Sequence, residues 1–94
     1  MMDGEHIKYY DTSEIHSKIN YLDGKFHGEL IRYFKDGEIR SKRNYLEGNR
    51  HGEFIRYFIT GEISYKCNYI NDNLVTELEW LCYIRNTKFE LLGL

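Results

Sequence analysis

The sequence has no proline, alanine or glutamine among its 94 residues, and it has only two cysteines. The missing residue types suggest an AT-rich genome and exclude no activity. Cys67 and Cys82 are too few for a disulfide framework, so we interpret both as reduced thiols. No apolar run approaches the ~18 residues of a membrane-spanning helix, and the N-terminus lacks the basic and apolar regions of a signal peptide. We therefore expect a cytoplasmic protein without a transmembrane segment.

A strong excess of charge of one sign is also missing. Thirteen Lys and Arg residues stand against fifteen Asp and Glu residues, which gives a net charge of -2. This balance excludes the strongly basic chains that attract nucleic acid, so we expect no specific nucleic-acid partner. No Ser or Cys stands in a nucleophile motif, and no glycine loop opens a helix that could hold phosphate. The sequence therefore predicts no enzyme and no cofactor.

What the sequence does contain is an internal repeat. A unit of 24 residues occurs three times, at residues 4–27, 28–51 and 52–75. The clearest match is GELIRYF at residues 28–34, which returns as GEFIRYF at residues 52–58. Such a period indicates stacked supersecondary units that bury their surfaces against each other. We therefore expect one domain over residues 1–94, with a degenerate capping segment at residues 76–94.

Each unit contains two runs of alternating polarity around a turn, which is the pattern of a β-hairpin. A three-residue loop needs positive φ only at Ser13, Gly37 and Gly61, whereas a two-residue mirror turn would place the β-branched Thr12 or Thr60 there. We therefore predict three-residue loops. In that register the odd-numbered Ile and Tyr residues share one face, with Arg43 as its lone charge. Between the hairpins, paired glycines predict a longer loop with bulges.

The turn glycines, the aromatic pairs at residues 33–34 and 57–58, and the His-Gly pairs at residues 27–28 and 51–52 resemble MORN repeats. The closer similarity is to the variant with a Gly-x-x-His-Gly connection. The resemblance implies a curved antiparallel sheet of successive hairpins. Together with the period-two pattern and the turns of each unit, we expect an all-β fold: a single curved antiparallel meander sheet of stacked hairpins with seven to eight strands and room for a short C-terminal cap. It implies protein–protein contacts, and in some members phospholipid binding, but no catalytic residues.

The face opposite the Ile and Tyr residues is basic and partly aromatic, and we take it as the candidate binding face. Its members are Lys8, Tyr10, Arg32, Phe34, Arg40, Lys42, Arg56, Phe58 and Lys66. Its net cationic excess over the glutamates is small, so it predicts only weak binding to anionic lipid. His27 and His51 are one unit apart, about 10 Å across two strands, which argues against a metal site. We interpret them as turn residues that bond a neighbouring backbone.

The tail breaks the repeat, and Trp80 is its candidate cap or anchor. The segment has apolar residues on both faces of any strand, as expected of a segment that closes an array. They are Leu78, Trp80, Cys82 and Ile84 on one side and Leu81 and Tyr83 on the other. Two forms stay open. Glu77-Leu78 matches Glu53-Phe54 and favours another strand, which we prefer, while Thr76-x-x-Glu79 with Asn86 as an end signal favours a capped helix.

These observations leave several functions to compare. The leading hypothesis is a non-catalytic interaction module or scaffold that binds a protein partner through one face or through its open N-terminal edge strand, and that edge would also allow homo-oligomers. The alternatives are a module that binds phospholipid or another anion at a membrane surface, and an antitoxin or immunity protein. A Trp-rich choline-binding repeat fits less well, because this chain has one Trp and no signal peptide.

Overall fold

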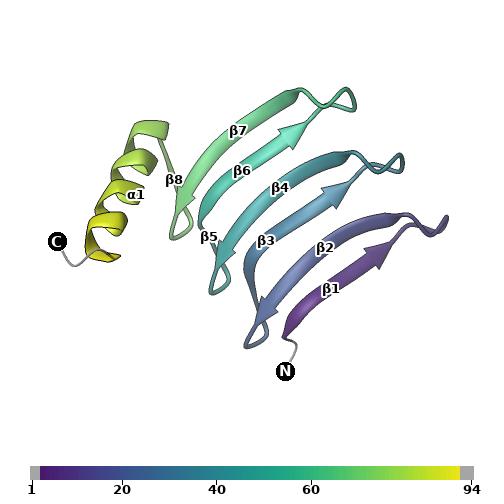
Figure 1. Ribbon diagram of the computed structural model, residues 1–94, viewed down its shortest axis with the longest axis horizontal. Helices are drawn as coiled ribbons and strands as arrows, with labels where there is room; N and C mark the ends of the chain where they lie inside the picture. Colours follow the sequence, from purple (N-terminus) through teal and green to yellow (C-terminus); the bar gives the residue numbers. More distant parts are fainter. Residues whose placement is uncertain (1–2, 92–94) are drawn as a thin grey trace.

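The computed structural model describes residues 3–91, with side chains for residues 3–86. It is a single antiparallel sheet of eight strands in the order β1-β2-β3-β4-β6-β7-β8, with β5 paired to β4, followed by one helix (Figure 1). The elements are β1 (Gly4–Tyr9), β2 (Ile15–Leu22), β3 (Lys25–Tyr33), β4 (Ile39–Leu46), β5 (Asn49–Arg50), β6 (Gly52–Tyr57), β7 (Ile63–Ile70), β8 (Asn73–Val75) and α1 (Glu77–Leu91). The predicted meander of stacked hairpins is confirmed.

The three-residue loops inside the hairpins are confirmed. The N–H of Phe34 donates to the carbonyl of Glu38 at 2.8 Å, and the N–H of Gly37 donates back to the carbonyl of Phe34 at 3.0 Å. The third loop residue has positive φ in every hairpin, at 81° for Ser13, 95° for Gly37 and 94° for Gly61. The positive φ thus falls on Ser13, Gly37 and Gly61 and not on the β-branched Thr12 or Thr60, as predicted.

The connections between hairpins are tighter than the longer loop that we predicted. Asp23 and Gly24 have φ values of 52° and 78°, and Leu22 pairs directly with Lys25, so the connection is a two-residue turn. The predicted irregularity lies just after it, where Gly28 has a φ of 84°. In the third copy Asn71 and Asp72 take the same turn without a glycine, since Asn and Asp tolerate positive φ.

A β-bulge in each hairpin overturns the predicted faces. Tyr33 pairs with Ile39, but the preceding residue Arg32 pairs with Ser41, so Arg40 is an extra residue on β4. His16 and Ser64 are skipped in the same way on β2 and β7. Side chains alternate between the two faces of a sheet, so one extra residue moves the side chains beyond it to the face opposite the predicted one. The prediction that odd-numbered positions share one face is therefore wrong.

The true register gives the sheet two distinct faces, because directly paired residues point to the same side. The aromatic face carries a row of rings with centroids 4.7–5.8 Å apart, in the order His6, Tyr21, Phe26, Tyr45, Phe54 and Tyr69. The Lys/Glu face carries Glu5, Lys18, Lys25, Glu29, Lys42, Glu53 and Lys66 with the isoleucines at 7, 31 and 55.

The hydrophobic core is thin. Among the described residues only two apolar side chains are buried, Ile19 and Leu30, and both belong to the aromatic face beside the ring row. This follows from the architecture, because a single sheet without a second layer can bury apolar surface only between side chains of neighbouring strands. The row of rings therefore supplies much of the burial that joins one hairpin to the next.

Side chains that recur in each unit tie successive units together. The side-chain amide of Asn44 donates to the carbonyl of Glu53 at 2.9 Å, and Asn20 donates to Glu29 at 3.2 Å. His27 Nδ1 accepts the N–H of Glu47 at 3.4 Å, and His51 Nδ1 accepts that of Asn71 at 3.3 Å. The interpretation of the histidines as turn residues bonded to a neighbouring backbone is confirmed.

The tail forms helix α1 rather than the strand that we preferred. Its N-terminus is a capping box, in which the N–H of Glu79 donates to Thr76 Oγ1 at 3.1 Å and the N–H of Thr76 donates to Glu79 Oε1 at 3.0 Å. The helix continues past Asn86, the expected end signal, to Leu91. It lies beyond β8 at the end of the sheet away from the N-terminus (Figure 1), and residues 92–94 of the predicted capping segment lie outside the described residues. No helix of the described chain has the length and apolar character needed to cross a membrane.

Trp80 and Tyr83 connect α1 to the last repeat. The Trp80 ring contacts the His51 ring edge-on at 5.8 Å and stacks on Tyr83 at 5.6 Å. Tyr83 also meets His51, at 5.2 Å. Trp80 thus lies against the last repeat, and its role as a cap stays a prediction.

Candidate functional site

The register divides the predicted binding face between the two sides of the sheet. Lys8, Arg32 and Arg56 pair with Ser17 and Ser41 on the aromatic face. Lys42 and Lys66 pair with Ile31 and Ile55 on the Lys/Glu face. The face is divided because each hairpin has a bulge with one extra residue on its second strand. Even-numbered residues therefore point to one side of the sheet on the first strand and to the other side on the second strand.

The remaining members of the predicted face lie at the hairpin turns. The Tyr10 hydroxyl donates to the carbonyl of Tyr33 at 2.6 Å and so joins the first hairpin to the second. The guanidinium of Arg40 lies over the Phe34 ring, with 5.8 Å from Cζ to the centroid. Phe58 is exposed. Two of the three aromatic side chains are therefore engaged in contacts within the array.

Charge is distributed unequally between the two faces. Five cationic residues at paired strand positions belong to the aromatic face, and no strand carboxylate accompanies them: Lys8, Arg32, Arg43, Arg50 and Arg56. On the Lys/Glu face the lysines stand beside Glu5, Glu29 and Glu53, and Lys66 Nζ lies 3.6 Å from Glu53 Oε2. The aromatic face is thus the cationic face of the sheet, while the opposite face is nearly neutralised.

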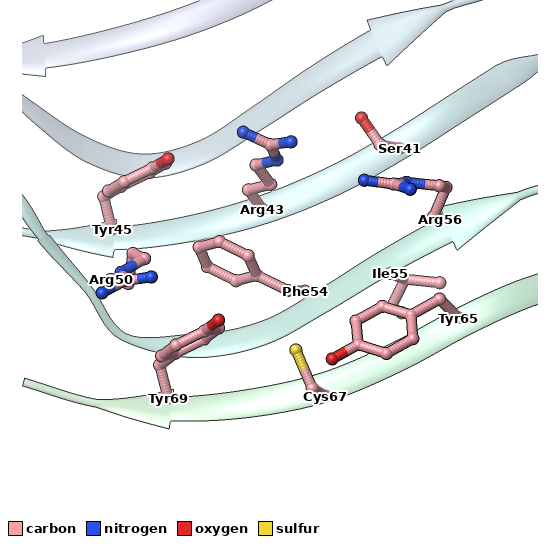
Figure 2. Close-up of a pocket in the computed structure, with 10 residues that line it drawn as sticks. All are labelled: Ser41, Arg43, Tyr45, Arg50, Phe54, Ile55, Arg56, Tyr65, Cys67 and Tyr69. Atoms are coloured by element: carbon pink, nitrogen blue, oxygen red, sulfur yellow. The ribbon is translucent and has the colours of Figure 1, made fainter. Parts of the chain in front are cut away.

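A pocket of about 260 Å³ opens on the aromatic face between the second and third repeats. Arg43 and Tyr45 come from β4, Phe54 and Arg56 from β6, and Tyr65, Cys67 and Tyr69 from β7 (Figure 2). The guanidinium of Arg43 lies 5.9 Å from the centroid of the Phe54 ring. Figure 2 shows the Arg56 guanidinium reaching toward β4, so the charged groups of Arg43 and Arg56 stand on the same side of the pocket.

Arg50 is held at one end of this pocket. Its Nε lies 3.1 Å from Asp72 Oδ1, its Nη2 donates to the Asp72 carbonyl at 3.2 Å, and its Cζ is 4.5 Å from the centroid of the Tyr69 ring. The backbone N–H of Arg50 also donates to Asp72 Oδ1 at 2.7 Å. This backbone hydrogen bond, with the side-chain bond from Arg50, lowers the pKa of Asp72 from its usual 3.8. The cluster joins β5 to the last turn and fixes one wall.

Tyr65 and Cys67 form the opposite wall on β7. Figure 2 shows the Tyr65 hydroxyl beside the Cys67 sulfur. Their hydrogen bond is the main cause that raises the pKa of Tyr65 above its usual 10.0, and Arg56 acts in the other direction. The phenol is therefore neutral at physiological pH and keeps a hydroxyl that can donate or accept a hydrogen bond in the pocket.

We expect Asp72→Asn to destabilise the fold in a pH-dependent way. The pKa of Asp72 is lowered in the folded chain, so its charge stabilises the fold above pH 3.8, and this contribution is lost as the pH falls through the lower folded-state pKa. The variant should melt at a lower temperature than wild type at pH 7, and the two curves should converge below pH 3.8. Thermal melts from pH 2 to 8 would measure this.

The control for that comparison is Asp36→Asn. Asp36 also accepts a backbone N–H, from Glu38 at 2.9 Å, but lies in a hairpin loop away from Arg50. A difference between wild type and Asp72→Asn that stays constant across the pH range would contradict the assigned role of the carboxylate charge.

Several residues of the pocket were missed at the sequence level. Arg43 stood out as a charge among apolar residues, but Arg50 and Phe54 did not. Comparison at the repeat distance would have found them, because Arg50 stands where the previous unit has Phe26, and Phe54 stands where it has Leu30. The register was also needed to show that Arg56 shares their face.

Comparison with known proteins supports the repeat assignment. A family model described as "MORN repeat variant" matches residues 2–23, 26–47 and 50–71. These three matches cover more than half of the chain and fall on the three hairpins and their connecting turns. No curated protein and no solved structure matches the sequence.

Proposed function

Because the chain belongs to the MORN repeat variant family, we propose that it is a non-catalytic interaction module that binds a protein partner on its aromatic face. MORN repeats occur in modules that contact proteins or membranes, and the family is generally non-catalytic. The observation that carries the proposal is the gathering of arginines and aromatic rings on one face. Arg and Tyr are enriched where protein interfaces concentrate their binding energy.

The unequal distribution of charge supports this choice of face. A row of like charges destabilises the sheet slightly, so the fold itself gives no reason to keep Lys8, Arg32 and Arg56 together without carboxylates. An anionic partner would supply the missing counter-charges. The Lys/Glu face already has its own, as in the pair between Lys66 and Glu53.

Binding to an anionic membrane is the second candidate, and the same cations favour it. Arg50 is already bonded to Asp72, which leaves Lys8, Arg32, Arg43 and Arg56 to contact lipid. At about 1 kcal/mol per cation these four side chains would supply about 4 kcal/mol, a dissociation constant on the order of 1 mM. A protein partner can add contacts to the rings, so we favour it. An antitoxin or immunity role would be a special case, recognised by the identity of the captured partner.

Charge reversal on each face in turn would test the proposal. We expect the double variant Arg32→Glu and Arg56→Glu to lose partner capture from the native source while it keeps the wild-type melting temperature, since both side chains are exposed. The matched control is Lys18→Glu with Lys42→Glu on the Lys/Glu face, which should retain the partner. Loss of capture in the control and retention in the first variant would overturn the assignment of the face.

A further inference from the structure

The pocket is built from positions where the chain departs from its own repeat. Arg43 replaces the buried Ile19 of the first unit, and in the third unit Tyr65 replaces the buried Ser41 of the second. Arg50 and Phe54 likewise replace Phe26 and the buried Leu30. Residues that every unit shares are explained by stacking, whereas these four substitutions meet around one cavity. Phe54 also belongs to the ring row, and Arg50 is bonded to Asp72. Neither of these contacts requires Arg43 or Tyr65, so these two substitutions indicate a binding site.

Two guanidinium groups in the pocket have no counter-charge among the described side chains. Within the side chains of residues 3–86, neither Arg43 nor Arg56 has a carboxylate at ion-pair distance, whereas Arg50 is paired with Asp72. A guanidinium presents donors in a planar fork that matches a carboxylate. The hydroxyls of Tyr65 and Ser41 line the same pocket and can complete the hydrogen bonding.

A straight row of cations leads across the sheet to this pocket. Lys8 pairs with Ser17, Ser17 with Arg32, Arg32 with Ser41, and Ser41 with Arg56. The small, buried serines leave the row open between its long side chains. Successive cations are two strands apart, about 10 Å, which is close to three residues of a polyproline II helix at about 3.1 Å each. In that conformation every third side chain points to the same side.

We propose, on the premise that the aromatic face binds a protein partner, that the ligand is an extended acidic segment of that partner. The segment lies across the strands as a polyproline II helix with a carboxylate at every third residue. One carboxylate binds Arg43 and Arg56 in the pocket, and the next two reach Arg32 and Lys8. Neither a free phosphate nor a fluid lipid surface would need charges at this fixed spacing, so the spacing favours a peptide.

The test uses two rhodamine-labelled peptides of the same composition. One has glutamates at every third position, (Glu-Gly-Ser)₃, and the other has its three glutamates adjacent. Fluorescence anisotropy with the full chain should show roughly tenfold tighter binding of the spaced peptide, and this preference should weaken as salt rises. Equal binding of the two peptides, or none, would overturn the proposal.

Variants locate the site. Arg43→Ile restores the residue of the first repeat, so it should keep the fold, and we expect it to weaken binding of the spaced peptide roughly tenfold, as Arg56→Ser should. Arg43→Lys keeps the charge without the fork and should fall between wild type and Arg43→Ile. Lys42→Ser on the Lys/Glu face should have no effect. An equal loss with Lys42→Ser would contradict the site.

Two competition experiments test whether the pocket instead binds free phosphate or a lipid headgroup. Inorganic phosphate at 10 mM should not displace the spaced peptide beyond the effect of equal ionic strength, and vesicles of phosphatidylcholine and phosphatidylserine should not compete with it. Specific displacement by either would overturn the choice of a peptide. If the spaced peptide fails while the native partner is still captured through Arg32 and Arg56, the acidic segment is wrong and the proposed function stands; if both fail, the proposed function is wrong.

Discussion

Replacing Tyr45 by Ala is expected to lower the free energy of unfolding by about 2–4 kcal/mol. Tyr45 lies in the middle of the ring row, with centroids 5.1 Å from Phe26 and 5.8 Å from Phe54, so its loss removes contacts to the units on both sides. A single sheet with few buried apolar side chains has little else to compensate for such a loss. Chemical denaturation followed by far-UV circular dichroism would measure the change.

Two control variants separate the possible causes. Tyr45→Phe keeps the ring and removes only the hydroxyl, so we expect a cost below about 1 kcal/mol. Tyr9→Ala removes a tyrosine that is 60% exposed and lies outside the row, and it should also cost less than about 1 kcal/mol. Equal losses for Tyr45→Ala and Tyr9→Ala would contradict the idea that the ring row joins the units.

The second large effect is expected for Gly52→Ala, at about 2–4 kcal/mol. Gly52 has a φ of 109°, which disfavours any side chain, and an added Cβ would lie 3.1 Å from the Cβ of Asn44. Asn44 cannot move freely, because its amide donates to the carbonyl of Glu53. The substitution therefore strains the backbone and also presses on a bond that links two units.

Gly28→Ala is the matched control. Gly28 occupies the same place one unit earlier, with a φ of 84°, but nothing lies within 4 Å of an added Cβ. It should show the backbone strain alone, about 1–2 kcal/mol. If the two alanine variants unfold at the same denaturant concentration, the contact with Asn44 does not contribute to the cost.

The hairpin architecture could be predicted from the sequence because local rules decide it. A positive φ suits Gly37 and Gly61 but not Thr60, and this contrast alone selected the right loop. The bulge could not be predicted in this way. The extra residue is His16, Arg40 or Ser64 in the three units, so no residue type marks it, and its consequence was to reverse the assignment of the faces.

The tail and the site show the same limit. Thr76 and Glu79 do signal a helix start, but the apolar residues around Trp80 fit a strand equally well, and the contact with His51 that holds the helix is long-range. The sequence did show Arg43 as the one charged residue among the odd-numbered Ile and Tyr positions. Arg43 and Arg56 share a pocket only because of the way the strands pair. An alternating sequence pattern cannot predict this pairing, because it does not exclude a shift of one residue.

Photo-crosslinking in the native source would test most directly whether the aromatic face binds the partner. A benzophenone side chain would be placed at position 32 on the aromatic face and, in a second protein, at position 42 on the Lys/Glu face. These positions lie on adjacent strands, β3 and β4, so access to the two sides of the sheet is the main difference. We predict a crosslinked partner from position 32 and none from position 42. A crosslink from position 42 alone would contradict the account.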